Sequence, residues 1–208
     1  MSCSAAILAG GPSKRIKGEK ALLDLAGKPL IRRVYGAVVE AVDEVIVVVE
    51  AEEKIKSYSS VLPQCRYVVD QCKTRSPLAG ALTAFGASKS DYTLLLPCDT
   101  PFISADLVSL LIGLFPRHEA VVPRWPNGYL EPLQATYNTE KGLKAAESAL
   151  SEGKLNMASM IGKLRNVLYL STIVIQQVDP GLDSFFNVNT ELDLREAEKR
   201  LRLKVRGS

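Results

Sequence analysis

Residues 45–49 are five consecutive β-branched residues, Val-Ile-Val-Val-Val, with no polar residue among them. A strand with one solvated face alternates apolar and polar residues, whereas a strand of a parallel sheet is covered on both faces. The segment therefore predicts a buried parallel strand. Parallel strands in turn require long crossover connections, which are usually helices.

The rest of the chain supplies the strands and helices that such a sheet needs. Short apolar runs predict strands, and apolar residues at helical spacing predict helices. Their alternation predicts one α/β domain over residues 1–208, a single-domain, Rossmann-like, mostly parallel sheet with helices on both faces. We expect strands at 5–9, 45–49, 66–69, 92–96, 120–123 and 133–137, an extended segment at 167–178, and helices at 29–41, 52–58, 77–87, 106–115, 140–150, 156–163 and from 190 onward.

Two local patterns complete this outline. Asn127-Gly128 predicts a turn within a hairpin or flap that carries Trp125. This flap either covers a second substrate or is a surface hairpin with a half-buried indole. The segment from Thr190 to Asp193 has the pattern of a capping box at the start of the last helix. The basic residues within 199–208 favour a solvated, frayed helix end over a nucleic-acid contact.

Composition excludes several classes of chemistry. The chain has one histidine, His118, which excludes a site built from two or three histidines, and we expect it in a surface loop. The four cysteines form no C-x-x-C pair and are expected to be free thiols. The net charge is only +3, and no apolar segment reaches the length that spans a bilayer. We therefore expect a cytoplasmic protein that binds neither nucleic acid nor membrane.

The loop that follows the first predicted strand, residues 8–20, is rich in glycine and in cations but lacks the Walker A spacing. Adjacent glycines let backbone amides approach phosphate oxygens. This pattern favours a nucleoside triphosphate site, and an ordinary glycine-rich turn with solvated lysines is the alternative. The groups that would meet phosphates are the amides of Gly10 and Gly11, the hydroxyl of Ser13 and the cations of Arg15 and Lys20.

Two carboxylates also follow predicted strands. Asp99 comes soon after the apolar strand at 92–96, and Asp70 directly follows the strand at 66–69. Open parallel sheets bind ligands at the carboxyl ends of their strands, so Asp99 is placed to hold a divalent cation on phosphates. A helix-capping role for Asp99 and a plain turn role for Asp70 are the alternatives.

Five motifs in order along the chain resemble the molybdenum cofactor guanylyltransferases, a nucleotidyltransferase family with a GT-A-type Rossmann sheet. The first loop is similar to their L-A-G-G-x-S-x-R-M-G-x-D-K signature. The other matches are Pro77 to Gly80 with G-P-L-A-G, Cys98 to Phe102 with C-D-x-P-F, Glu131 to Tyr137 with P-L-x-A-x-Y, and Phe186 to Thr190 with F-x-N-x-N-T.

The resemblance implies roles for individual residues. One asparagine of the last motif, Asn187 or Asn189, would lie near the metal ion, and Asn189 is favoured. The remaining implied contacts are Leu8, Ala9, Gly10 and Asp70 with the nucleotide, Arg15 and Lys20 with its phosphates, and Asp99 with Mg²⁺.

The implied reaction is an in-line displacement at the α-phosphorus of GTP, in which the terminal phosphate of the molybdopterin cofactor attacks and pyrophosphate leaves. Mg²⁺ is the implied cofactor, and GTP and a molybdopterin-type phosphate are the implied substrates. Candidate protein partners are those of molybdopterin synthesis or molybdoenzyme maturation. Three alternatives stay open: a cytidylyltransferase of the same cofactor, an adenosylcobinamide-phosphate guanylyltransferase, and a non-catalytic GTP-binding regulatory protein.

The chain departs from the family pattern at several positions. Near Glu50 to Glu52, where the family has an asparagine that helps to hold the nucleotide, two glutamates stand instead. In the motifs, Ile16 replaces methionine, Lys17 replaces glycine, Glu19 replaces aspartate and Ser76 replaces the glycine before Pro77.

Overall fold

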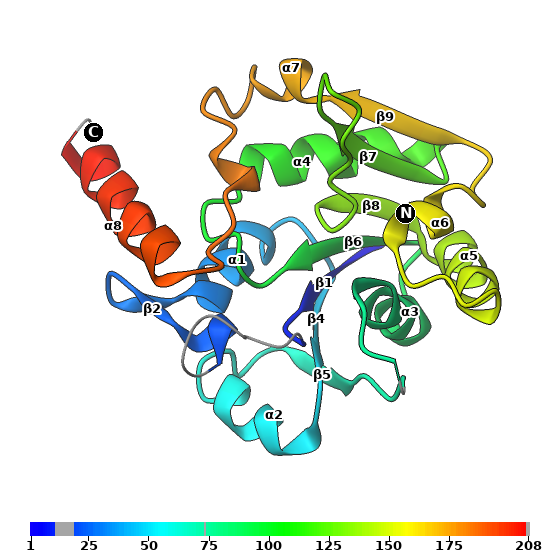
Figure 1. The fold of residues 1–208 in the computed structure, drawn as a ribbon, viewed down its shortest axis with the longest axis horizontal. Coiled ribbons are helices and arrows are strands. Elements are labelled where there is room, and N and C mark those ends of the chain that lie inside the picture. Colours follow the sequence, from blue (N-terminus) through cyan, green and yellow to red (C-terminus); the bar gives the residue numbers. More distant parts are fainter. Residues whose placement is uncertain (11–18, 73, 207–208) are drawn as a thin grey trace.

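The computed structural model describes residues 1–10, 19–72 and 74–206. Its centre is a seven-stranded sheet with the strand order β5-β4-β1-β6-β8-β7-β9 (Figure 1). In that order the strands are β5 (Arg66–Val69), β4 (Glu44–Val49), β1 (Cys3–Leu8), β6 (Tyr92–Pro97), β8 (Ala135–Asn138), β7 (Ala120–Arg124) and β9 (Val167–Ser171). A separate two-stranded ribbon pairs β2 (Asp24–Leu25) with β3 (Lys28–Pro29).

Within the described part of the sheet, β8 is the one strand that runs against its neighbours. It pairs antiparallel with β6 and β7, whereas the other neighbouring pairs are parallel. Strand β1 lies between β4 and β6, with Leu8 opposite both Val48 and Pro97. The mostly parallel, Rossmann-like sheet expected from the sequence is confirmed.

Helices cover both faces of this sheet (Figure 1). Helices α1, α2 and α4 share a hydrophobic core with one face, and helices α3, α5 and α6 share a second core with the other face. Their bounds are α1 (Leu30–Val38), α2 (Glu52–Ser59), α4 (Ala105–Leu114), α3 (Pro77–Ala87), α5 (Thr139–Ser151) and α6 (Met157–Ile161).

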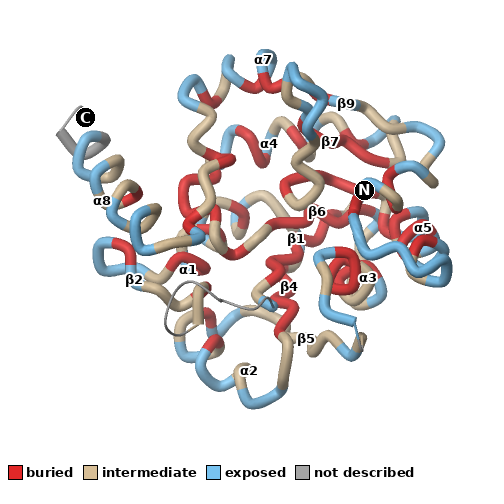
Figure 2. Tube along the Cα trace, in the orientation of Figure 1, coloured by how far each residue is buried: buried red, intermediate tan, exposed pale blue. Residues whose placement is uncertain are grey.

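Strand β4 contributes to both cores. Val45, Val47 and Val49 belong to the first core, and Ile46 and Val48 belong to the second. All five side chains are at most 7% exposed, and Figure 2 shows the central strands as a buried band inside more exposed helices. The unbroken β-branched run therefore has the physical basis predicted for it, which is burial on both faces of a parallel sheet.

The extended segment predicted at 167–178 is wrong in its second half. Strand β9 ends at Ser171, and the short helix α7 (Thr172–Ile175) follows. The Ser171 hydroxyl accepts a hydrogen bond from the backbone N of Ile173 at 3.2 Å, which caps this helix. Ile173 and Val174 are β-branched and favour a strand, but the capped turn decides the local conformation.

Three other predicted elements are shorter than expected, and one of them is helix α6, which spans Met157–Ile161 rather than 156–163. Helix α1 ends at Val38 rather than at 41. Strand β8 begins at Ala135 rather than at 133, because the backbone N of Gln134 donates to the carbonyl of Glu131 at 3.2 Å and closes a turn there. Strand β5 and helix α3 have the predicted bounds.

The predicted hairpin around Asn127-Gly128 is present. The backbone N of Trp125 donates to the carbonyl of Tyr129 at 2.8 Å, and Gly128 has a φ of +88°, which favours glycine. The partly buried Trp125 indole packs edge-on against Phe185 with ring centroids 5.6 Å apart. Its Nε1 donates to Glu131 Oε1 at 2.7 Å.

The last helix, α8 (Glu191–Arg206), follows the short 3-10 helix η3 (Asp183–Phe185). The backbone N of Asp193 donates to Thr190 Oγ1 at 3.2 Å, and Asp193 Oδ2 accepts from the backbone N of Thr190 at 2.8 Å. This reciprocal pair is the predicted capping box. Fraying of 199–208 stays a prediction, and residues 207–208 lie outside the described part. No helix within 1–10, 19–72 and 74–206 is long and apolar enough to cross a bilayer.

The contact between α3 and α5 is tight at Gly142. A Cβ at this position would lie 2.9 Å from Cζ of Phe85, whose ring is 1% exposed and packs edge-on against Tyr137. We expect Gly142→Ala to lower the free energy of unfolding by about 1–3 kcal/mol, because the confined ring cannot yield without strain. Urea unfolding followed by circular dichroism measures this change.

A matched control is Gly113→Ala in α4, where nothing lies within 4 Å of the added Cβ. This variant should be neutral or more stable by up to about 1 kcal/mol, since alanine favours the helix over glycine. Equal stabilities of the two variants would contradict the close approach of α5 to Phe85.

Candidate functional site

A cavity of about 420 Å³ lies at the carboxyl ends of the parallel strands β1, β4, β5 and β6. This is the edge at which open parallel sheets bind ligands, since the loops that follow the strands converge there. Each strand contributes residues that follow its end: Ala9 and Gly10 after β1, Glu50 after β4, Asp70 after β5, and Cys98 and Asp99 after β6.

Part of the cavity wall is apolar. Leu8 and Val48 are opposite each other on neighbouring strands, and a Cβ at Gly80 would lie 3.5 Å from Cδ1 of Leu8. Pro77, at the start of α3, and Leu133 also line the cavity. A wall of this kind suits a flat, apolar ring face.

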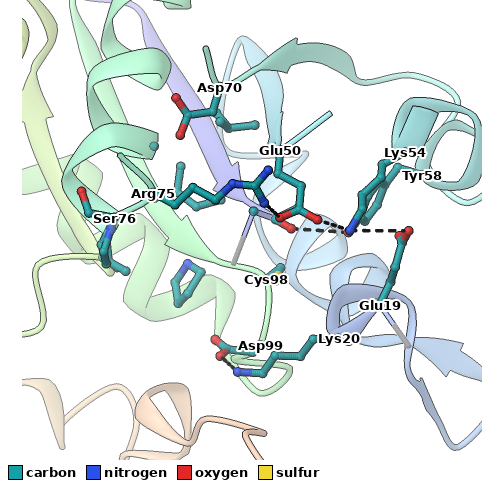
Figure 3. A pocket seen from close by; sticks show the side chains of 18 residues that line it. Glu19, Lys20, Glu50, Lys54, Tyr58, Asp70, Arg75, Ser76, Cys98 and Asp99 are labelled. Carbon is teal, nitrogen blue, oxygen red and sulfur yellow. Dashed lines mark hydrogen bonds and ion pairs between the residues drawn. The ribbon is translucent and has the colours of Figure 1, made fainter. Parts of the chain in front are cut away.

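Lys20, Asp99 and Asn189 meet beside this wall, although they are far apart in the sequence. Lys20 opens the 3-10 helix η1 (Lys20–Leu22), and its ammonium forms an ion pair with Asp99 Oδ2 (Figure 3). The same Nζ donates to Asn189 Oδ1 at 2.6 Å. The cation therefore bridges one oxygen atom from the loop after β6 and one from the segment before α8.

The second carboxylate oxygen of Asp99, Oδ1, is buried and has no hydrogen-bond partner within the described residues. Leaving a buried carboxylate oxygen unpaired is costly, so the site is incomplete without a further cationic or donor group. Carboxylate and amide oxygens are the ligands that hard divalent cations prefer. Asp99 does not cap α4, because Ser104 accepts from the backbone N of Leu107 at 3.0 Å and fills that role.

The two candidate asparagines have different surroundings. Asn189 reaches Lys20, and its backbone N donates to Asp193 Oδ2 at 2.9 Å, which ties it to the capping box. The Asn187 amide instead donates to the carbonyl of Phe185 at 3.1 Å, within its own segment. The geometry therefore brings the Asn189 side chain to Lys20, the ion-pair partner of Asp99, whereas the Asn187 amide bonds within its own segment.

Asp70 lines the cavity and is fixed by local hydrogen bonds. Its backbone N donates to the carbonyl of Val49 at 2.8 Å. Its Oδ1 accepts from Thr83 Oγ1 at 2.9 Å and from the backbone N of Cys72 at 3.0 Å. Asp70 is therefore both a turn residue and part of the cavity wall.

The first loop is described only at its two ends. Leu8, Ala9 and Gly10 line the cavity, and the backbone N of Ala9 donates to the carbonyl of Val48 at 2.9 Å. The predicted contacts of Gly11, Ser13 and Arg15, and the departures at Ile16 and Lys17, lie outside the described residues.

Sequence reasoning did not find a second group of charges on the cavity wall. Glu50 Oε1 pairs with Lys54, and Glu50 Oε2 accepts from Arg75 Nη1 at 2.5 Å (Figure 3). Lys54 also lies 3.8 Å from Glu19 Oε1. The i,i+4 spacing of Glu50 and Lys54 was a readable signal, but nothing local in the sequence brings Arg75 to Glu50. Glu52 is exposed and does not line the cavity.

The four cysteines are free thiols. Burial raises the pKa of Cys3 and Cys98 to about 12 and the pKa of Cys65 to about 11. Burial and the neighbouring Asp70 carboxylate also raise the pKa of Cys72. Because the thiolate is the reactive form, the structure does not activate Cys98 although it lines the cavity.

His118 lies away from this cavity. It follows the 3-10 helix η2 (Phe115–Arg117), and its Nδ1 is 3.1 Å from Asn166 Oδ1. It is partly exposed beside the start of β7, as expected for a loop residue.

Comparison with known proteins extends the motif resemblance to most of the chain. Residues 5–167 match the family model of the MobA-like NTP transferase domain. The probable molybdenum cofactor guanylyltransferase of Methanosarcina mazei is 32% identical over 197 residues, which cover 92% of this chain and 88% of that protein. The molybdenum cofactor guanylyltransferase of Desulfosudis oleivorans is 32% identical over 198 residues, which cover 94% of each chain.

The fold is also similar to a solved structure. The crystal structure of molybdopterin-guanine dinucleotide biosynthesis protein A from Archaeoglobus fulgidus aligns with a TM-score of 0.82 at 27% identity. The alignment covers 96% of this chain and 98% of that one. The similarity therefore includes the sheet, the helices and the edge that carries the cavity.

The thiol environments predict an order of reactivity. At pH 8, a pKa of about 12 leaves only about one thiolate in ten thousand, so Cys3 and Cys98 should react with a disulfide reagent only on unfolding. Cys72 should give the fastest phase of thiol titration, and Cys72→Ser should remove that phase. A fast phase that survives in Cys72→Ser would contradict this order.

Proposed function

The chain belongs to the MobA-like NTP transferase family, and on that premise we propose that it transfers GMP from GTP to the terminal phosphate of the molybdenum–molybdopterin cofactor and releases pyrophosphate. The observation that carries the proposal is the meeting of Lys20, Asp99 and Asn189 beside a cavity at the carboxyl edge of the sheet. We also propose that residues 1–208 form one nucleotidyltransferase domain.

The lining of the cavity supports one orientation of the bound nucleotide. The base would lie against the apolar wall at Leu8, Val48 and Gly80, and the phosphates would extend toward Lys20. Leu8, Ala9, Gly10 and Asp70 are proposed nucleotide contacts because they line the same cavity. The amide of Gly11, the hydroxyl of Ser13 and the guanidinium of Arg15 are proposed phosphate contacts on the motif resemblance alone.

Proteins of this family typically use a divalent metal. The described residues fit such an ion, because Asp99 offers a buried, unpaired Oδ1 and Asn189 holds its amide oxygen close by. We propose Mg²⁺ on Asp99 and Asn189. Bound there, the ion would supply positive charge to the phosphate oxygens of the nucleotide.

The proposed reaction needs no nucleophile from the protein, since a phosphate oxygen of the second substrate attacks the α-phosphorus directly. The bond between the α-phosphorus and the bridging oxygen breaks, and pyrophosphate takes that electron pair. Lys20 would move from Asp99 and Asn189 to phosphate oxygens and offset their negative charge, as would Arg15. The rigid strand ends would hold the two reacting groups in line.

The same proposal implies the substrates, the cellular location and the protein partners of the enzyme. GTP and a molybdopterin-type phosphate are its proposed substrates, and its proposed location is the cytoplasm. Proteins of molybdopterin synthesis or molybdoenzyme maturation are the proposed partners, because the cofactor must be delivered to the enzyme and passed on. Two named relatives at 32% identity over nearly the whole chain favour the guanylyl transfer over the cytidylyl transfer.

Replacing Asp99 tests the metal assignment. Asp99→Asn keeps the side-chain shape and the hydrogen bond between its backbone carbonyl and Val188 N, so the fold should persist. We expect metal-dependent pyrophosphate release to fall by about a hundredfold or more, because one electrostatic group of the transition state is lost. A coupled pyrophosphate assay with GTP and purified molybdopterin cofactor measures the rate.

The control for this variant is Asp106→Asn, which changes an exposed carboxylate in the first turn of α4. It should release pyrophosphate at the wild-type rate. Wild-type turnover in Asp99→Asn would overturn the assignment of the metal to this carboxylate.

Replacing Lys20 separates two roles of its ammonium. In Lys20→Met, the affinity for GTP should fall by about tenfold or more, since a charge-assisted contact to phosphate is lost. The affinity for Mn²⁺ without nucleotide should rise, because the ammonium no longer occupies the oxygens of Asp99 and Asn189. Calorimetry with GTP and electron paramagnetic resonance of Mn²⁺ measure the two changes.

Lys56→Met is the matched control for Lys20→Met, since Lys56 is exposed on α2 and does not line the cavity. Both affinities should match the wild type in the control. Unchanged GTP titrations in Lys20→Met would count against the phosphate contact.

A further inference from the structure

Four charged side chains form an alternating series along one wall of the cavity. Arg75 pairs with Glu50, Glu50 pairs with Lys54, and Lys54 lies 3.8 Å from Glu19. Figure 3 shows Arg75 reaching Glu50 from the side of α3, while Lys54 reaches it from α2. Two carboxylates and two cations leave this series without net charge.

The Glu50 carboxylate is held by a different cation at each oxygen. Lys54 forms an ion pair with Oε1, and Arg75 donates a hydrogen bond to Oε2. An ionised carboxylate has about four lone-pair sites, two on each oxygen, and it can only accept hydrogen bonds. With respect to residues 1–10, 19–72 and 74–206, acceptor capacity therefore remains on each oxygen, which makes Glu50 an acceptor for two neighbouring donors.

The two cations also make a carboxylate compatible with an anionic ligand. An unpaired glutamate in a cavity that takes a triphosphate would repel it, because like charges at short range are unfavourable in a site with little water. The Glu50 side chain is only 16% exposed. Lys54 and Arg75 offset its charge and leave its accepting atoms in place.

The donors that Glu50 can meet are limited by the chemistry of a nucleoside triphosphate. Phosphate oxygens accept hydrogen bonds, so a carboxylate cannot bind them. Among the common bases, guanine alone carries two adjacent donors on one edge, N1–H and the 2-amino group. Adenine and cytosine place one amino group beside an acceptor nitrogen on the corresponding edge, and an acceptor facing that nitrogen is unfavourable.

From these contacts we infer that Glu50 determines base specificity, accepting hydrogen bonds from N1–H and the 2-amino group of guanine, and that Arg75 is a positioning residue for its carboxylate. The inference rests on the proposed function for the presence of a nucleotide in the cavity. It adds to that function a chemical reason for choosing guanine, built from a side chain that follows β4, one on α2 and one that precedes α3. The glutamates that depart from the family pattern at 50 and 19 belong to one series of ion pairs.

The test compares the dissociation constants of GTP and ITP, measured by calorimetry with Mg²⁺ present. ITP lacks only the 2-amino group of GTP. The ratio of the two dissociation constants therefore reports the hydrogen bond that Glu50 accepts from that amino group. We expect the wild-type protein to bind GTP about 10- to 100-fold more tightly than ITP, and CTP and ATP more weakly than GTP. In Glu50→Met, which has no accepting oxygen, the ratio should fall to about 1.

The ratio is the informative quantity in this experiment. Removing Glu50 leaves Lys54 and Arg75 without their shared partner, which changes the attraction for every triphosphate but changes GTP and ITP alike. The matched control is Glu53→Met, because Glu53 is exposed on α2 and does not line the cavity. This control should keep the wild-type ratio.

Two further variants test the positioning role of Arg75. Its side chain is 62% exposed, so its ion pair with Glu50 should add little to stability. We expect Arg75→Met to lower the ratio of GTP to ITP affinity several-fold without changing the urea unfolding midpoint, and Arg75→Lys to restore most of that ratio. An unchanged ratio in Arg75→Met would overturn the positioning role.

The outcomes separate this inference from the function on which it rests. Equal affinities of the wild-type protein for GTP and ITP, or a wild-type ratio in Glu50→Met, overturn the role of Glu50. If GMP transfer to the molybdopterin cofactor proceeds in that case, the proposed function stands. A wild-type protein that binds none of the four triphosphates overturns both.

Discussion

Strand β1 is held between β4 and β6, and this pairing sets the positions of Glu50 and Asp99 in the cavity. Leu8 lies opposite both Val48 and Pro97, so the three strands end at nearly the same level. A slip by one residue would turn every side chain of a strand to the opposite face, which burial on both faces does not permit. Glu50 and Asp99 therefore emerge at one edge because the apolar strands before them cannot shift.

The two charge clusters at this edge are joined by neighbouring residues of the chain. Glu19 turns toward Lys54, and Lys20 turns toward Asp99. The end of the loop at 8–20 is therefore fixed between a group of ion pairs on α2 and a carboxylate after β6. Residues 19 and 20 therefore contact both proposed functional groups. Glu19 is linked to Glu50 through Lys54, and Lys20 is the proposed phosphate contact.

The sheet was predictable from the sequence because it depends on local patterns that burial imposes. The run at 45–49 and the exact bounds of α3 follow from side-chain periodicity and turn residues alone. Of the candidate site, the motifs singled out Lys20, Asp99 and either Asn187 or Asn189, and the structure brings Lys20, Asp99 and Asn189 together. The sequence did not identify the contact of Arg75 with Glu50, which depends on how α3 and β4 are placed in space. It also misjudged 172–178, where a serine cap outweighs the strand preference of Ile173 and Val174.

The segment before α8 closes the site from the far end of the fold. The backbone N of Val188 donates to the carbonyl of Asp99 at 2.9 Å, and Asn189 reaches Lys20 from 169 positions away along the chain. During synthesis the strands around the cavity leave the ribosome before this segment does. The nascent chain can therefore form its sheet and the apolar wall of the cavity while the amide oxygen of Asn189 is still missing. Completion of the proposed cation site is in this sense a late step of biosynthesis, set by the order of the elements along the chain.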